Sequence, residues 1–157
     1  MKGYILAGGL SQRFGSDKAR YLVDGEPLAV RIAAVLRAAG LDPWLVARAP
    51  RGLGLPELLE PDGPRHPLWG VAAALGEGSD AFVIPCDLVD VRVEQVRALS
   101  DAGAIAAGQP LFGVYPARLR DRARAFAEAG GSVRAFVAEL PVLDVGPIAN
   151  LNQPIGS

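Results

Sequence analysis

The residues best suited to chemistry lie near the start of the chain, where an apolar run ends in two glycines and a cationic loop. Residues 4–7 are apolar and run directly into Gly8 and Gly9, and Arg13 and Lys18 follow in a polar stretch. Glycines adopt backbone conformations closed to other residues and leave room for a ligand. Backbone N–H groups and fixed positive charges that converge in this way bind phosphate. The segment therefore predicts a phosphate-binding loop after a strand.

Lys18 is unusual against the composition of the chain. Among 16 basic residues only Lys2 and Lys18 are lysines, and the other 14 are arginines. A compact ammonium can contact phosphate oxygens as a point charge in a loop that is too narrow for a planar guanidinium. The alternative is a solvated surface lysine after a glycine turn. The neighbouring glycines and Arg13 favour the phosphate-binding interpretation.

The carboxylate of Asp87 is the second group that could do chemistry. It follows the apolar run 81–84, and an unpaired carboxylate there would be costly to bury. A cation offsets that cost, and Mg²⁺ favours one or two carboxylates together with substrate phosphates. As alternatives, Asp87 caps the next helix or begins an Asx turn, and Asp90 could serve as that cap. Its position at a strand end favours metal binding.

The apolar segments predict the scaffold that positions these groups. Strands are expected over residues 4–7, 44–47, 57–60, 81–84, 104–106, 111–115 and 142–145, alternating with helices after Pro27 and over 68–75, 93–99 and 116–129, and a short helix capped by Ser132. This alternation predicts one α/β domain over residues 1–157, Rossmann-like and three-layered, with a mostly parallel sheet covered by helices on both faces. Ligands bind at the carboxyl ends of such strands, which selects residues 8–18, residues 62–70 and Asp87.

Composition excludes several classes of function. The net charge of −1 and the lack of a basic stripe disfavour nucleic-acid binding. No apolar run approaches the ~20 residues of a membrane span and no signal-peptide pattern is present, which predicts a cytoplasmic protein without membrane partners. Cys86 and His66 are each the only residue of their kind, which excludes an intrachain disulfide and argues against a structural zinc site. A Cys–His nucleophile pair has no further support, and we expect Cys86 to be a buried apolar residue at a strand end.

Five segments together resemble the molybdenum cofactor guanylyltransferase family, within the wider nucleotidyltransferase superfamily. The first and most specific is LAGGLSQRFGSDK at residues 6–18, which fits neither a P-loop nor a GxGxxG motif. The others are DGEPL at 24–28, PLWG at 67–70 with His66 where the family usually has glycine, PCD at 85–87 and NLNQP at 150–154. They occur in the order of the family and cover nearly the whole chain.

The resemblance implies a role for each matching residue. Leu6, Ala7, Gly8 and Gly9 would contact the nucleotide, Lys18 the triphosphate with help from Arg13, Asp62 the guanosine, Asp87 the Mg²⁺, and Asn150 or Asn152 the metal or the acceptor phosphate. Arg13, Lys18 and Asp87 are the predicted catalytic residues. The chain departs from the family where an Asn usually follows the second strand, since residues 46–48 read Val-Ala-Arg. Asp62 aligns only with a gap, Gln153 replaces Thr, and the sequence stops at Ser157 before the family's C-terminal helix.

The reaction implied by the resemblance transfers GMP from GTP to the phosphate of molybdopterin and releases pyrophosphate. Such transfers require positioning and charge neutralisation, and the attacking phosphate is already an anion near neutral pH. No catalytic Ser, Cys or His is therefore needed. Three alternatives remain open: a cytidylyltransferase for the same pterin, a transferase for another small acceptor, and a GTP-binding adaptor for molybdoenzymes or other cofactor-biosynthesis proteins.

Overall fold

A single large sheet organises the computed structural model, which describes residues 1–7, 22–23, 26–50, 52–61 and 66–149. Its strands are β1 (Lys2–Leu6), β4 (Asp42–Ala47), β5 (Glu57–Leu59), β6 (Ala81–Pro85), β7 (Ile105–Ala106), β8 (Gln109–Tyr115) and β9 (Val142–Leu143). The helices are α1 (Leu28–Ala38), α2 (Leu68–Leu75), α3 (Val93–Ala102), α4 (Arg120–Ala129) and α5 (Val133–Phe136), with a 3₁₀ turn η3 (Ala117–Leu119) before α4. Two short strands, β2 (Leu22–Val23) and β3 (Glu26–Pro27), pair antiparallel beside the start of α1.

The strand order is β5-β4-β1-β6-β8-β7-β9, and β1 runs parallel to both of its neighbours, β4 and β6. From β1 the chain passes outward to β4 and β5, and it then returns to add β6 on the opposite side of β1. The carboxyl ends of β1 and β6 therefore flank a topological switch point, where open α/β sheets form their ligand crevice. Only β8 is antiparallel to its neighbours in the described sheet, which confirms the predicted, mostly parallel arrangement.

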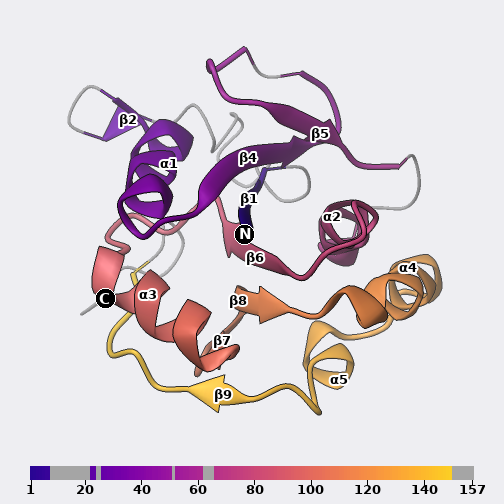
Figure 1. The fold of residues 1–157 in the computed structure, drawn as a ribbon. Helices are drawn as coiled ribbons and strands as arrows, with labels where there is room; N and C mark the ends of the chain where they lie inside the picture. The colour runs from indigo at the N-terminus through magenta and orange to yellow at the C-terminus, as the bar shows by residue number, and fades with distance from the viewer. Residues whose placement is uncertain (8–21, 24–25, 51, 62–65, 150–157) are drawn as a thin grey trace.

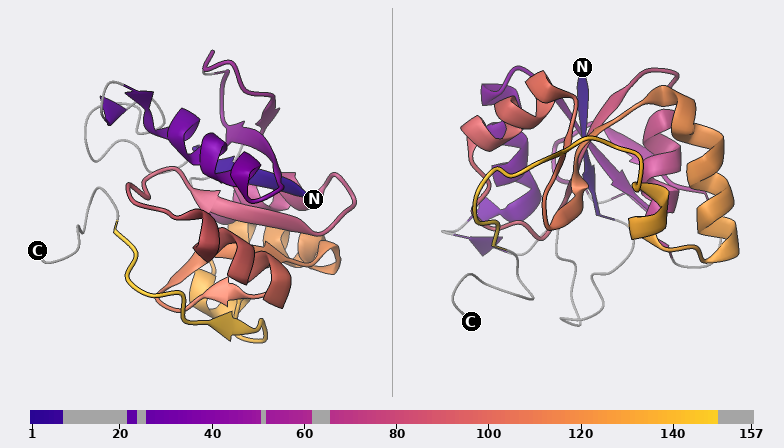
Figure 2. Two further views of the ribbon diagram at one scale, coloured as in Figure 1. Left: turned by 60° about the vertical axis from the view of Figure 1, so that its left-hand side comes forward. Right: turned by 90° about the horizontal axis from the view of Figure 1, so that it is seen from below.

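Helices cover both faces of the sheet, as predicted. Helices α1 and α3 lie on one face, and α2, α4 and α5 lie on the other (Figures 1 and 2). Alternate residues of a strand point to opposite faces, so Tyr4 packs on the α2 side while Ile5 packs on the α1 side. The result is the three-layered α/β/α architecture.

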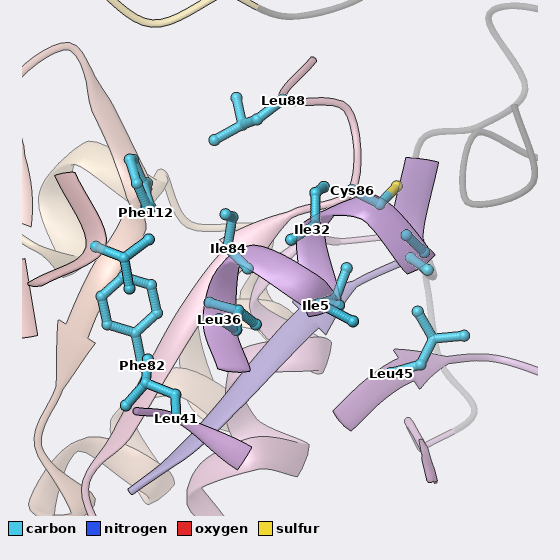
Figure 3. Close-up of a cluster of buried hydrophobic side chains, with 14 of the residues drawn as sticks. Ile5, Ile32, Leu36, Leu41, Leu45, Phe82, Ile84, Cys86, Leu88 and Phe112 are labelled. Carbon is cyan, nitrogen blue, oxygen red and sulfur yellow. The ribbon is translucent and has the colours of Figure 1, made fainter. Parts of the chain in front are cut away.

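The core on the α1 side fixes the ends of β1 and β6 relative to one another. Leu28, Ile32 and Leu36 form one buried stripe along α1, spaced four residues apart. Figure 3 shows Ile32 and Leu36 of this stripe in the cluster with Ile5 and Ile84, which come from the two strands that flank the switch point. Rigid packing beneath the carboxyl edge keeps the groups on that edge at fixed separations.

One helix begins later than the sequence predicts. The helix expected over 116–129 begins as the turn η3, and the α-helix itself starts at Arg120, because Pro116 favours extended backbone (φ −73°, ψ 144°). The helix after Ser132 is present as expected, with the Ala135 N–H donating to the Ser132 hydroxyl at 3.0 Å. Among the described residues no helix combines the length and the apolar character needed to cross a membrane.

Candidate active site

The carboxyl ends of β1, β4 and β6 meet at one edge of the sheet, and β1 lies in the middle. The Ala7 N–H donates to the carbonyl of Val46 at 2.7 Å, and the Cys86 N–H donates to the carbonyl of Leu6 at 3.1 Å. The predicted nucleotide-binding residues Leu6 and Ala7 are thus held from both sides. Gly8, Gly9, Arg13 and Lys18 lie outside the described residues, but the chain that carries them leaves β1 at this point.

Asp87 lies in the turn directly after β6, at the same edge, and is partly buried. The interpretation of Asp87 or Asp90 as a helix cap is wrong, because α3 begins only at Val93. Its start is closed by the Arg92 N–H, which donates to the side-chain oxygen of Gln95 at 2.9 Å. The carboxylate therefore does not cap α3, and it lies at the carboxyl edge of the sheet, where the sequence places it.

Cys86 and His66, considered above as a nucleophile pair, both occupy positions that stabilise the fold. Cys86 is 7% exposed and packs in the α1-side core, as expected. The Nδ1 of His66 accepts from the Leu68 N–H at 3.1 Å, so its Nε2 carries the proton and donates to the Gly131 carbonyl at 2.6 Å. Both ring nitrogens of His66 bind backbone, and the ring ties the first turn of α2 to the residues between α4 and α5.

The edge also carries an ion pair that the sequence analysis missed. The Arg48 Nε lies 3.1 Å from the Glu60 Oε1, and the Glu60 side chain is only 5% exposed, against 30% for Arg48. Backbone pairing brings them together, because the Glu60 N–H donates to the Ala47 carbonyl at 2.9 Å. The available signal was a pair of opposite charges that directly follow two consecutive strands of a parallel sheet.

Gly70, in the first turn of α2, lies beside the Glu60 end of this pair. A Cβ added at Gly70 would lie 3.1 Å from the Leu6 Cδ2 and 3.5 Å from the Glu60 Oε2. The helix start can approach the carboxyl edge this closely only because position 70 has no side chain. We call Arg48, Glu60 and Gly70 the β4 flank of the site. Asp62, which follows Glu60 by two positions, lies outside the described residues.

The opposite side, which we call the β6 flank, consists of Asp87 and residues 145–149. The Val89 N–H donates to the carbonyl of the buried Ala149 at 3.2 Å, so the chain just before Asn150 lies beside the loop that carries Asp87. The Gln95 amide, 3% exposed, donates to the carbonyls of Val145 at 3.2 Å and Pro147 at 3.3 Å. Asn150 and Asn152 themselves lie outside the described residues.

Gln95 was also missed by the sequence analysis. The available signal was a polar residue beside Val96 on the otherwise apolar face of the helix 93–102.

The described residues contain no cluster of three or more His, Cys, Asp or Glu side chains able to hold a metal ion. A cation held by Asp87 would therefore have one described carboxylate as a ligand and would complete its shell from elsewhere. Mg²⁺ suits such a site, because it is commonly bound through one or two carboxylates and the phosphates of a substrate. The chemistry of the donor thus fits a metal that arrives with a nucleotide.

Comparison with known proteins gives concordant results. Residues 3–144 match the family model of the MobA-like NTP transferase domain. The chain is 33% identical over 147 residues to a protein of Pyrococcus furiosus named probable molybdenum cofactor guanylyltransferase, covering 82% of this chain and 74% of that protein. A protein of the same name from Opitutus terrae is 33% identical over 184 aligned residues, covering 98% of this chain and 91% of that protein.

Among solved structures, the fold is shared with the molybdopterin-guanine dinucleotide biosynthesis protein A of Archaeoglobus fulgidus. The TM-score is 0.73 at 20% identity, over 92% of this chain and 82% of that one. At this identity the likeness concerns the fold alone. It agrees with the three-layered architecture described above.

Proposed function

Because the chain belongs to the family of MobA-like NTP transferase domains, it is a nucleotidyltransferase, and we propose that it transfers GMP from GTP to the phosphate of molybdopterin. A phosphate oxygen of the acceptor attacks the α-phosphorus of GTP and forms a new P–O bond. The bond from the α-phosphorus to the bridging oxygen breaks, and pyrophosphate leaves with the electron pair. The products are molybdopterin guanine dinucleotide and pyrophosphate.

The observation that carries this proposal is the convergence of the LAGG strand end and Asp87 on one switch point. Leu6 and Cys86 share a backbone hydrogen bond of 3.1 Å there, so the loop after β1 and the carboxylate after β6 start side by side. In the proposed complex Gly8 and Gly9 present backbone N–H groups to the phosphates. Lys18 and Arg13 add positive charge where negative charge grows as pyrophosphate leaves. A site of this kind works by position and charge, without a covalent intermediate.

We assign the metal to Asp87 and propose that it is Mg²⁺. When bound, the ion neutralises charge on the phosphate oxygens and orients them. Asp87 contributes the protein carboxylate and keeps it at the β1–β6 edge through the turn that follows β6. Asn150 and Asn152 are proposed to approach the metal or the acceptor phosphate. Support for this comes from Ala149, whose carbonyl accepts from Val89 two residues beyond Asp87.

Guanine is the proposed base. Asp62 can accept from the N1–H and the exocyclic amine of guanine, or from the ribose hydroxyls, and the backbone near Leu6 and Ala7 lies at the same edge. Asp62→Ala should reduce discrimination between GTP and CTP if the carboxylate reads the base. None of the comparisons favours a cytidylyltransferase, another small-acceptor transferase or an adaptor over this function.

Pyrophosphate release from each of the four nucleoside triphosphates, with and without molybdopterin, tests the proposal. We expect release from GTP only when molybdopterin and a divalent metal are both present. Release that prefers CTP would identify a cytidylyltransferase for the same acceptor. Nucleotide binding without release from any triphosphate would support the adaptor and overturn the transferase.

A further inference from the structure

We propose that Gln95 positions the acceptor substrate by holding residues 145–149 beside the loop that carries Asp87. The inference rests on the proposed function, because it assumes that the phosphate of molybdopterin is the acceptor. Gln95 acts through the main chain that it binds, so it is a positioning residue and need not touch either substrate. It should set the affinity for the acceptor and leave the affinity for GTP unchanged.

The topology of the sheet brings residues 145–149 to its carboxyl edge. Strands β6 and β7 are both antiparallel to β8, and β9 is parallel to β7, so β9 ends at the same edge as β6. In the strand order β9 lies three positions beyond β6, which is about 14 Å at the usual strand spacing. From β9 the chain returns beside α3 (Figure 1), and the Ala149 carbonyl accepts from the Val89 N–H at 3.2 Å. The segment therefore links the outermost strand to the loop that carries Asp87.

Gln95 binds this segment from a buried position in the first turn of α3. The residue is 3% exposed, and its Nε2 donates to the carbonyls of Val145 at 3.2 Å and Pro147 at 3.3 Å. Its Oε1 accepts from the Arg92 N–H at 2.9 Å. A buried amide is costly unless it is hydrogen-bonded, and all three of these bonds are to main-chain groups. One side chain thus joins the start of α3 to the chain that follows β9.

The direction of the segment depends on these bonds, because residues 144–149 form neither a strand nor a helix. Val145 and Ile148 pack partly buried against the α1-side core, which places the segment on that face of the sheet. Apolar contacts are non-directional, so they do not orient the carbonyl groups. The carbonyls of Val145, Pro147 and Ala149 are instead bound by the Gln95 amide and the Val89 N–H.

The place of the segment matches the acceptor rather than GTP. The proposed contacts to GTP come from the loop after β1 and from Asp62, which follows β5 at the other end of the sheet. Asn150 and Asn152, proposed to approach the metal or the acceptor phosphate, follow the segment directly in the sequence. Small misplacements of positioning groups are costly. A shift of Ala149 should therefore weaken acceptor binding while the contacts to GTP stay in place.

Gln95→Met tests the inference, because methionine matches the length of glutamine but makes none of its hydrogen bonds. We expect the KM for molybdopterin to rise about threefold, well below the ~10²-fold cost of a 1 Å misplacement, because Val145 and Ile148 still pack in place. The Kd for GTP, from calorimetry without acceptor, should be unchanged. The matched control is Asp80→Ala, which removes the side-chain acceptor of the Ala117 N–H (2.8 Å) at the opposite, amino edge of the sheet. It should change neither constant.

Gln95→Glu adds a readout that a general loss of stability would not give. Its carboxyl group keeps an oxygen for the Arg92 N–H, and it has one O–H donor when protonated and none when ionised. The ratio of its KM for molybdopterin to the native KM should therefore rise with pH, whereas the ratio for Gln95→Met should stay level. At each pH the Kd for GTP should equal the native value.

A native KM for molybdopterin in Gln95→Met, or a KM that rises together with the Kd for GTP, would overturn the inference. The transferase is scored separately, by pyrophosphate release from the native chain. If the native chain releases none, the transferase is refuted, and the Kd for molybdopterin from direct titration replaces its KM in the same comparison. A native chain that neither releases pyrophosphate nor binds molybdopterin would overturn both proposals.

Discussion

The two flanks of β1 are built differently although they share one edge of the sheet. On the β6 flank, main-chain hydrogen bonds dominate: Cys86 binds Leu6, Val89 binds Ala149, and the Asp87 carboxylate is only partly buried. On the β4 flank an ion pair joins the partly exposed Arg48 to a nearly buried Glu60, which lies beside the start of a helix. A partly exposed carboxylate suits the proposed hydrated metal and phosphates, whereas the Arg48–Glu60 pair, 30% and 5% exposed, is more enclosed. We therefore expect changes on the β6 flank to act mainly on turnover and changes on the β4 flank to act mainly on nucleotide binding.

The largest effect should follow from a change on the β6 flank. Asp87→Asn removes the carboxylate proposed to hold Mg²⁺, and loss of a group that stabilises transition-state charge lowers turnover on the order of 10²–10³-fold. The loss should be similar for every nucleotide accepted, and circular dichroism should show an intact fold. Near-normal turnover with an unchanged Mg²⁺ requirement would contradict the assignment.

A slightly smaller effect should come from the loop between the flanks. Lys18→Arg keeps the charge, but its broad guanidinium should fit poorly between glycines, so we expect turnover to fall on the order of 10²-fold with most GTP binding retained. Lys18→Ala should likewise lower kcat more than it weakens GTP binding, because the charge matters most as pyrophosphate leaves. Steady-state kinetics beside calorimetry separates the two quantities. Full activity of Lys18→Arg would mean that charge alone is required.

A moderate effect is expected on the β4 flank from Gly70→Ala. The new methyl group would lie 3.1 Å from the Leu6 Cδ2 and displace Leu6 or Glu60, so KM for GTP should rise several-fold. Gly3→Ala is the matched control, because its methyl group would lie 3.0 Å from the Leu36 Cδ1 at the far end of β1. Overpacking should cost each variant about 1–3 kcal/mol of stability. An equal rise in KM for both variants would show that the effect is not local.

The smallest effect on chemistry should come from Gln95→Leu, which removes the hydrogen bonds that hold residues 145–149. Stability should fall by about 1–3 kcal/mol, because partner groups are left unsatisfied. The Val89 amide, bound to Ala149, should exchange its hydrogen faster, and KM for molybdopterin should rise while the Kd for GTP is unchanged. Unaltered hydrogen exchange at the Val89 amide would show that Gln95 does not hold the β6 flank in place.

The sequence predicts the scaffold well, because each strand is encoded by its own apolar run. Residues 81–84 and 68–75 appear as a strand and a helix with nearly the expected bounds, and Asp87 lies at a strand end as required. The Arg48–Glu60 pair was missed because it depends on the parallel pairing of β4 with β5, which no local pattern encodes. Gln95 was missed for a similar reason, since its partners lie 50 and 52 residues away.

The proposed transfer of a nucleotidyl group to a pterin phosphate can be tested by following the phosphates of GTP. GTP labelled at the α-phosphate or at the γ-phosphate would be incubated with the protein, Mg²⁺ and molybdopterin, and the products separated. We expect the α label to enter the pterin dinucleotide and the γ label to leave in pyrophosphate. A γ label on the pterin, or both labels remaining in GTP, would contradict it.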